Sequence, residues 1–323
     1  MISRTIFAAT CVLACAAAAP AARAEWPDHP VHWVVPFGPG GANDLIARVA
    51  ADAVSKRLGQ TIVIDNRPGA GAIVGTGAVA RAPADGYTFL IGAAGVITNS
   101  MLMKDLPYAD SDLVPVGMIA VAPSTIVVNP SIPASNMAEF VAWAKAQGDK
   151  GITWSTAGSG STPHFVAEMF KEATGMKVTI VPYRSGSDGV NAVLSNSVSA
   201  TSEASIVVLP QIKAGLLKAI ATTYEKRISA YPELKTTAEQ GFPTILIGHW
   251  AGLLAPRGTP EPIIQRMNAE LQTALKTPEV QNKLAESGIE TAAGSVADFA
   301  AFIASERQRL GALAAKAKMG ADH

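Results

Sequence analysis

Cysteine, charge and aromatic side chains are all scarce in this chain of 323 residues. Its two cysteines, Cys11 and Cys15, lie near the N-terminus, so the rest of the sequence offers no thiol for a disulfide, a metal site or a nucleophile. Charged residues make up only 16%, and 26 basic residues balance 26 acidic ones, which argues against nucleic-acid binding because that depends on neutralising phosphates. Aromatic residues are 6% and hydrophobic residues 49%, which predicts a large core of small and aliphatic side chains.

Enzyme signatures are absent as well. The sequence has no Gly-x-Ser-x-Gly elbow and no Walker Gly-Lys-Ser/Thr, and the glycines around Gly69-Ala70-Gly71 depart from the dinucleotide-binding spacing. Among five histidines only His29 and His32 are close together, without a third ligand nearby, so we predict neither a metal nor a cofactor. A hydrolase built on paired carboxylates stays open, because such carboxylates meet in space rather than in sequence.

The N-terminus carries the three parts of a secretory signal peptide. Met1–Arg4 is positively charged, Thr5–Ala19 is apolar, and Ala22-Arg23-Ala24 has the small-x-small form of a cleavage site. We predict cleavage after Ala24 and a periplasmic location. Loss of the two arginines in this segment leaves 24 basic and 26 acidic residues, a mature charge of −2. A lipid anchor on Cys15 is the less favoured alternative.

Apolar runs and helical patterns alternate in the first part of the mature chain. The expected elements are a strand at Val31–Pro36, a helix at Asn43–Leu58, a strand at Thr61–Ile64, a helix at Ile73–Arg81 and a strand at Tyr87–Ile91. Such a β-α-β-α-β series predicts a parallel sheet covered by helices.

The same alternation begins again after residue 124, including a helix at Pro133–Gln147 with Ser135 as its expected cap. We therefore predict an α/β fold of two similar lobes, with residues 25–123 and 249–323 in lobe 1 and residues 124–248 in lobe 2. The apolar extended runs Met118–Val128 and Ile245–Leu254 are the expected crossings between the lobes, although both also fit ordinary buried strands.

Glycine-rich turns between a strand and a helix are the most informative feature. They lie at residues 37–44, 92–95 and 157–162. In an open α/β sheet ligands bind at the carboxyl ends of strands, and the start of a helix presents unpaired N–H groups and a partial positive charge. Two such turns on facing lobes suit a ligand with a carboxylate at each end. Tight turn geometry alone is the alternative explanation.

Short motifs spread along the chain in a fixed order. They are Trp26-Pro27, Val34-Val35-Pro36-Phe37-Gly38-Pro39-Gly40-Gly41 with Asp44, Asn66-Arg67-Pro68-Gly69-Ala70-Gly71, Ala82-Pro83-Ala84-Asp85-Gly86-Tyr87-Thr88, Ala157-Gly158-Ser159-Gly160-Ser161-Thr162, Val181-Pro182-Tyr183-Arg184, Ile212-Lys213-Ala214-Gly215 and Gly252-Leu253-Leu254-Ala255-Pro256. In these motifs the chain resembles the Bug family, the extracytoplasmic solute receptors of tripartite tricarboxylate transporters, from Trp26 to about residue 315.

The resemblance implies a two-lobe periplasmic binding protein fold, type II-like, with the ligand closed between the lobes. The residues that it implies for ligand binding are Phe37, Gly38, Gly41, Asn43, Asp44 and Ala93 on one wall and Ser159, Ser161 and Thr162 on the other. We add Glu203, which with Ala204 stands where the family commonly has an Asp-Asn pair; Asn43 is a second departure. From sequence alone, Asp44 also fits a first-turn helix acid and Glu203 an exposed loop acid.

We predict a non-enzymatic, monomeric receptor that closes around a small organic mono- or dicarboxylate and docks transiently on a membrane permease, without a cofactor or nucleic acid. The alternatives are a sensor subunit that presents its ligand to a signalling receptor and a secreted α/β hydrolase.

Overall fold

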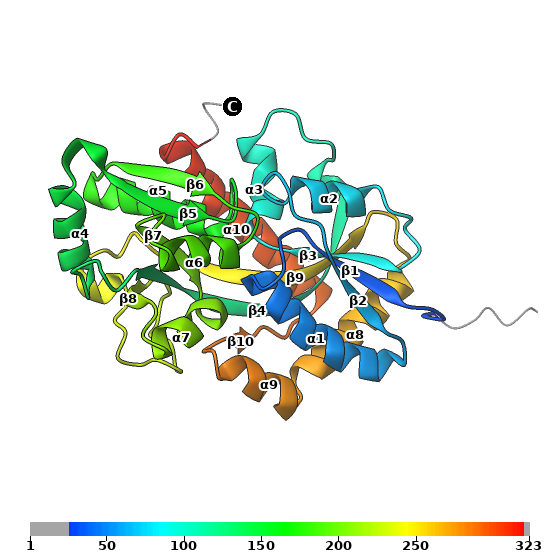
Figure 1. The fold of residues 1–323 in the computed structure, drawn as a ribbon. Helices are drawn as coiled ribbons and strands as arrows, with labels where there is room; N and C mark the ends of the chain where they lie inside the picture. The colour runs from blue at the N-terminus through cyan, green and yellow to red at the C-terminus, as the bar shows by residue number, and fades with distance from the viewer. Residues whose placement is uncertain (1–25, 320–323) are drawn as a thin grey trace, which may run out of the picture.

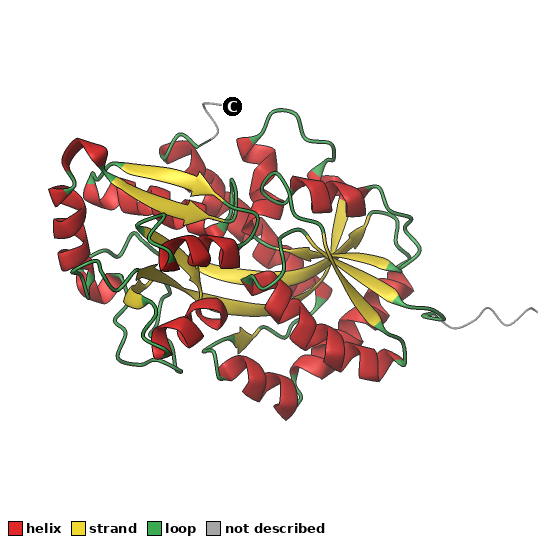
Figure 2. Cartoon of the chain, in the orientation of Figure 1, coloured by secondary structure: helices red, strands yellow, loops and turns green. Residues whose placement is uncertain are grey.

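A ten-stranded sheet runs through the molecule in the order β2-β1-β3-β9-β4-β7-β5-β6, with β8 and β10 paired to β4. The structure is a computed structural model that describes residues 26–319 (Figure 1). The predicted signal peptide and Cys15 lie outside the described residues. Helices cover the strands on both faces (Figure 2).

The first part of the chain forms the expected parallel unit. Its elements are β1 (Val31–Val35), α1 (Ala42–Leu58), β2 (Ile62–Asn66), α2 (Ile73–Ala80), β3 (Thr88–Gly92) and α3 (Ala94–Leu102). Strand β1 pairs in parallel with both β2 and β3. Each helix therefore returns the chain to the end of the sheet where the strands begin, and the turns after β1 and β3 lie together at the opposite, carboxyl end.

A second parallel unit repeats this arrangement. Its elements are α4 (Met137–Ala146), β5 (Ile152–Thr156), α5 (Thr162–Thr174), β6 (Val178–Pro182), α6 (Gly186–Leu194), β7 (Ala200–Ala204), α7 (Ser205–Lys213) and β8 (Lys218–Thr222). Strand β5 pairs in parallel with β6 and β7. The expected cap of α4 is wrong by one residue, because the side chain of Asn136, not Ser135, accepts the N–H of Glu139 at 2.9 Å.

Strand β4 (Leu113–Val128) belongs to both units. Its residues up to Pro123 pair with β9 (Gly248–Pro256), and its residues from Ser124 onward pair with β7 and β8. The switch falls within one residue, inside the segment expected to cross between the lobes. Short strand β10 (Glu290–Thr291) also pairs with β4.

The chain ends on helices α8 (Glu261–Leu275), α9 (Pro278–Ala285) and α10 (Val296–Lys316). Helices α8 and α9 pack beside α1, and α10 packs on β4 and α3. Among the described helices, none has both the length and the apolar character required to cross a bilayer.

Aromatic side chains, though few, fill the centre of each unit. Trp154 packs against Phe140 and Phe170, with ring centroids 6.3 and 5.4 Å away. Trp250 makes an edge contact with Phe299 at 6.0 Å. The rest of the core is mostly Ala, Val, Leu and Ile, as the composition predicts.

Candidate functional site

A cavity of about 30 Å³ lies where four helices begin. It is lined by Phe37, Gly41, Ala42, Asn43, Ala93, Ala94, Ala157, Ser161, Thr162, Pro163, Gly186, Glu203 and His249. Helices α1 and α3 contribute from one side of the switch in β4, and α5 and α6 from the other. The cavity is therefore shared by the two parallel units.

Three of these helices begin without a side-chain cap. Gly41 precedes α1, Ala93 precedes α3 and Ser161 precedes α5, and in none of them does the capping side chain accept a backbone N–H. Uncapped first turns leave N–H donors and a partial positive charge for an external acceptor. Helix α6 differs, because Ser185 caps it by accepting the N–H of Asp188 at 3.1 Å.

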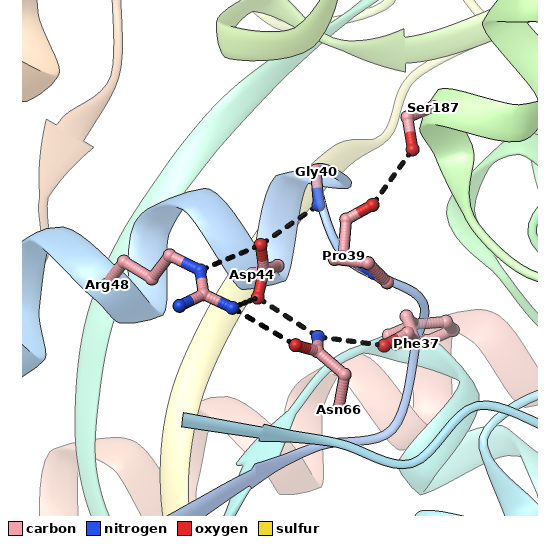
Figure 3. Close-up of polar contacts among 7 residues, drawn as sticks. All are labelled: Phe37, Pro39, Gly40, Asp44, Arg48, Asn66 and Ser187. Atoms are coloured by element: carbon pink, nitrogen blue, oxygen red, sulfur yellow. Dashed lines mark hydrogen bonds and ion pairs between the residues drawn. The ribbon is translucent and has the colours of Figure 1, made fainter. Parts of the chain in front are cut away.

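Hydrogen bonds between the turn before α1 and the segment around the start of α6 hold the two units together. The N–H of Gly38 donates to the carbonyl of Arg184 at 3.1 Å, and the Ser187 hydroxyl donates to the carbonyl of Pro39 at 3.0 Å (Figure 3). The side chain of Arg184 does not line the cavity; it borders an open outer groove of about 950 Å³. The structure thus shows a closed arrangement.

The backbones of the two units also approach each other closely where Gly71 lies against residues 158–159. A β-carbon on Gly71 would lie 2.5 Å from the carbonyl oxygen of Ser159, and one on Gly158 would lie 2.9 Å from the Cα of Gly71. Both glycines have positive φ, +61° and +102°. Glycine is therefore needed here for the backbone conformation and for the close approach.

Asp44 braces the turn that precedes α1. Its carboxylate accepts the N–H of Gly40 at 2.9 Å, the amide of Asn66 at 3.0 Å and Nε of Arg48 at 3.0 Å (Figure 3). Burial alone would raise the pKa of Asp44, but these hydrogen bonds and the positive charge of Arg48 outweigh it and leave the pKa below its usual value. The side chain does not line the cavity. It acts through the turn before α1, which its hydrogen bonds hold in place.

Two of the expected ligand donors are already engaged. The amide of Asn43 donates to the carbonyl of Trp250 at 3.0 Å and to that of Gly92 at 3.4 Å. The Ser161 hydroxyl donates to the carbonyl of Gly158 at 2.7 Å. These side chains fix the turns, which leaves the backbone to contact a ligand.

Glu203 and His249 face each other in the cavity. Oε1 of Glu203 lies 3.3 Å from Nε2 of His249 and accepts the N–H of Ala204 at 2.9 Å. Both side chains are buried, with exposed fractions of 2% and 6%. Burial raises the pKa of Glu203 to about 7 and lowers the pKa of His249 to about 3. Burial therefore shifts both groups toward their uncharged forms.

Most sequence-predicted site residues come together at this cavity. Its lining includes Phe37, Gly41, Asn43, Ala93, Ser161, Thr162 and Glu203, whereas Gly38, Asp44 and Ser159 lie around it. Glu203 is a buried residue of β7 rather than an exposed loop acid. Sequence reasoning missed Gly186 and His249. Gly186 lies between a strand and a helix, so the strand-turn-helix pattern could have identified it. His249 is a single histidine in an apolar run, and no pattern in the sequence marks it as a site residue.

The match to a family model covers residues 46–319, and that model describes the tripartite tricarboxylate transporter family receptor, TctC. The chain belongs to the TctC receptor family. The resemblance found in the motifs is thereby confirmed, and it extends over most of the chain.

Relatives of this TctC receptor include Protein BugT and two proteins of known structure. Protein BugT of Bordetella pertussis is 34% identical over 295 residues, which cover 90% of each chain. The periplasmic binding protein BugD is 32% identical with a TM-score of 0.87, covering 91% of this chain and 99% of that one. R. palustris Rpa4515, solved with adipate, is 33% identical with a TM-score of 0.88 and the same coverage. These matches confirm the predicted two-lobe fold. They also confirm the prediction that the protein is a receptor and not an enzyme.

Proposed function

We propose that this TctC receptor captures a small organic carboxylate in the cavity between its two lobes and delivers it to a membrane permease from the periplasm. The observation that carries the proposal is the meeting of three uncapped helix starts, of α1, α3 and α5, at one cavity. N–H groups and helix dipoles that converge in this way stabilise a carboxylate. The adipate bound by Rpa4515 is a carboxylate of this class.

Residues 25–123 and 249–323 form lobe 1 in this proposal, and residues 124–248 form lobe 2. The boundary follows the switch in β4 between Pro123 and Ser124. The return crossing is tied to it, because the Thr223 N–H donates to the carbonyl of Ser124 and the Ile247 N–H to that of Thr223, both at 2.8 Å. Rotation about these few residues would open and close the cavity.

Closure has to supply much of the binding free energy. One contact between an anion and a helix start stabilises by about 0.3–1 kcal/mol when exposed to water, whereas micromolar affinity requires about 8 kcal/mol. The described cavity of about 30 Å³ has room for two or three water molecules, at roughly 10–15 Å³ each. A ligand therefore enters an open form, and the closed form that holds it has a wider cavity than the structure shows.

Thr162 is the side chain that we assign to direct ligand contact on lobe 2. It lines the cavity at the first position of α5, and its hydroxyl takes part in no hydrogen bond within residues 26–319. We expect Thr162→Val to weaken binding without loss of stability. Ser161→Ala serves as its counterpart, because it removes the bond to Gly158 and should lower stability instead.

Calorimetric titration of the protein with adipate, malate, benzoate and aspartate tests the proposal. We expect saturable binding of at least one of these acids, and a rise in thermal stability that grows with the ratio of ligand concentration to Kd. Failure of all carboxylates to bind, together with turnover of any substrate, would favour the hydrolase alternative.

Delivery requires a test in cells. Deletion of the gene should impair uptake of the acid that binds, whereas a sensor subunit would change gene response and leave uptake intact. N-terminal sequencing of the periplasmic protein, expected to be a monomer in solution, checks the cleavage after Ala24.

A further inference from the structure

The carboxyl group of Glu203 and the imidazole of His249 are buried side by side in the cavity, but no hydrogen bond joins them within the described chain. Nε2 of His249 is 3.3 Å from Oε1 of Glu203 yet makes no hydrogen bond within the described chain. Among residues 26–319, the carboxyl group takes part in one hydrogen bond, in which Oε1 accepts the N–H of Ala204. Its other oxygen, Oε2, lies against Gly186 at the start of α6. The carboxyl group thus keeps hydrogen-bonding capacity for a ligand.

Among the described residues, the lining of the cavity around this pair contains no cationic side chain of lysine or arginine. Within residues 26–319, Glu203 and His249 are the two titratable side chains of this lining. Strands β4 and β5, which flank β7, carry no titratable residue. The titratable residues of the neighbouring helices that fall outside the lining are Asp44, Arg48, Asp52, Lys56 and Arg57 on α1, His164, Glu168, Lys171 and Glu172 on α5, Asp188 on α6 and Lys213 on α7.

An ionised Glu203 would place its negative charge beside the bound carboxylate. Two negative charges side by side in a buried site repel strongly, because water does not screen them. Burial disfavours the charged form of both Glu203 and His249 in any case. The uncharged acid, in contrast, has an O–H to donate.

We propose that Glu203 recognises the ligand as a neutral acid, its O–H donating a hydrogen bond to the bound carboxylate beside the uncharged imidazole of His249. When the acid is ionised beforehand, its carboxylate takes one proton from solvent as the anion binds, and the ligand is not changed. The site therefore favours carboxylates without an ammonium group over zwitterionic amino acids. This inference rests on the proposed function.

The neutral-acid role of Glu203 is tested by calorimetric titration at pH 6.0, 7.0 and 8.5, in buffers of different ionisation enthalpy. The probes are adipate, malate and benzoate, with aspartate as the ammonium counterpart of malate. We expect Kd for the tightest of the three acids to rise above pH 7 by up to about tenfold per pH unit, with about one proton taken up at pH 8.5. Glu203→Gln, neutral and still a donor, should bind with a Kd that does not change over this range. Glu233→Gln, an exposed control, should behave like the wild type.

The outcomes separate the two proposals. If an acid binds but its Kd is constant with pH in the wild type, or if Glu203→Gln retains the wild-type pH dependence, the proposed function stands and the neutral-acid role of Glu203 is overturned. Tighter binding of aspartate than malate, lost in folded Glu203→Gln, overturns it in favour of an ionised Glu203. If no carboxylate binds at any pH, the proposed function itself fails.

Discussion

The carboxyl group of Glu203 occupies the space that a β-carbon on Gly186 would need. The first residue of α6 therefore has to be glycine for Glu203 to reach the cavity. We expect Gly186→Ala to displace the acid, to abolish ligand binding and to lower the free energy of unfolding by about 1–3 kcal/mol, the usual cost of overpacking. Urea unfolding and calorimetric titration measure the two effects.

Gly77 provides the matched control for that substitution. A β-carbon there would meet the guanidinium end of Arg81 at 3.3 Å, and a flexible side chain can move. Gly77→Ala in α2 should keep binding and hold or slightly raise stability, because alanine favours helix. The double variant Gly186→Ala, Glu203→Ala should regain part of the lost stability; no recovery would contradict the steric explanation.

Closure of the lobes depends on the contact of Gly71 with Ser159. Gly71→Ala would set its β-carbon 2.5 Å from a carbonyl oxygen and hold the lobes apart. A closing cost of about 1–3 kcal/mol corresponds to weaker binding by about tenfold or more. Small-angle scattering with saturating ligand should show a larger radius of gyration than for the wild type.

Gly215→Ala separates closure from backbone strain. Gly215 has φ +71°, close to the +61° of Gly71, but a β-carbon on it would point into open space, with no atom beyond its chain neighbours within 4 Å. Both substitutions carry the same backbone penalty of about 1 kcal/mol, whereas only the change at Gly71 should weaken binding. Equal affinities in the two variants would rule out the role of Gly71 in closure.

Asp44 should stabilise the fold in a pH-dependent way. Its pKa is lower in the folded protein than its usual value, so its contribution is complete above about pH 4 and disappears as pH falls through the folded pKa. We expect Asp44→Asn to cost about 1–3 kcal/mol at pH 7, through weaker bonds to Arg48 and Gly40. Thermal unfolding at pH 7 and near pH 3 checks this, and a penalty of the same size at both would contradict it.

Glu203 should destabilise the ligand-free protein as pH rises. Its pKa increases from 4.5 to about 7 on folding, so stability declines between those pH values and the penalty is complete above pH 7. Relative to the wild type, Glu203→Gln should gain up to about 3 kcal/mol between pH 4.5 and pH 7. Urea unfolding across that range measures the gain, and a stability difference that is independent of pH would show that the acid is already ionised or solvated.

Local sequence features predicted the local parts of this molecule. Alternating apolar runs and glycine turns gave the two parallel units, because strand and helix patterns are set by neighbouring residues. The site was less accessible to this reasoning. In the sequence Asn43 looks like a free donor. In the structure its amide donates a hydrogen bond to the carbonyl of Trp250, which is more than 200 residues further along the chain.

His249 shows the same limit more clearly. It is one histidine in an apolar run, and only the pairing of β9 with β4 sets it opposite Ala122 and toward the cavity. Glu203 likewise becomes a site residue only because it is buried, and its burial follows from the pairing of β7 with β4 at Thr125. Strand register between distant segments decides both positions, and no local pattern encodes it.

Strand β9 lies between β3 and β4 although the chain reaches it only after the whole second unit has been made. Until Gly248–Pro256 is available, β3 and the first half of β4 each keep an unpaired edge toward the other. Contacts between segments so far apart form slowly, and unpaired edges attract other chains. A nascent or truncated chain that stops short of β9 is therefore the species most exposed to aggregation, and the last stretch of synthesis decides whether the first sheet is completed.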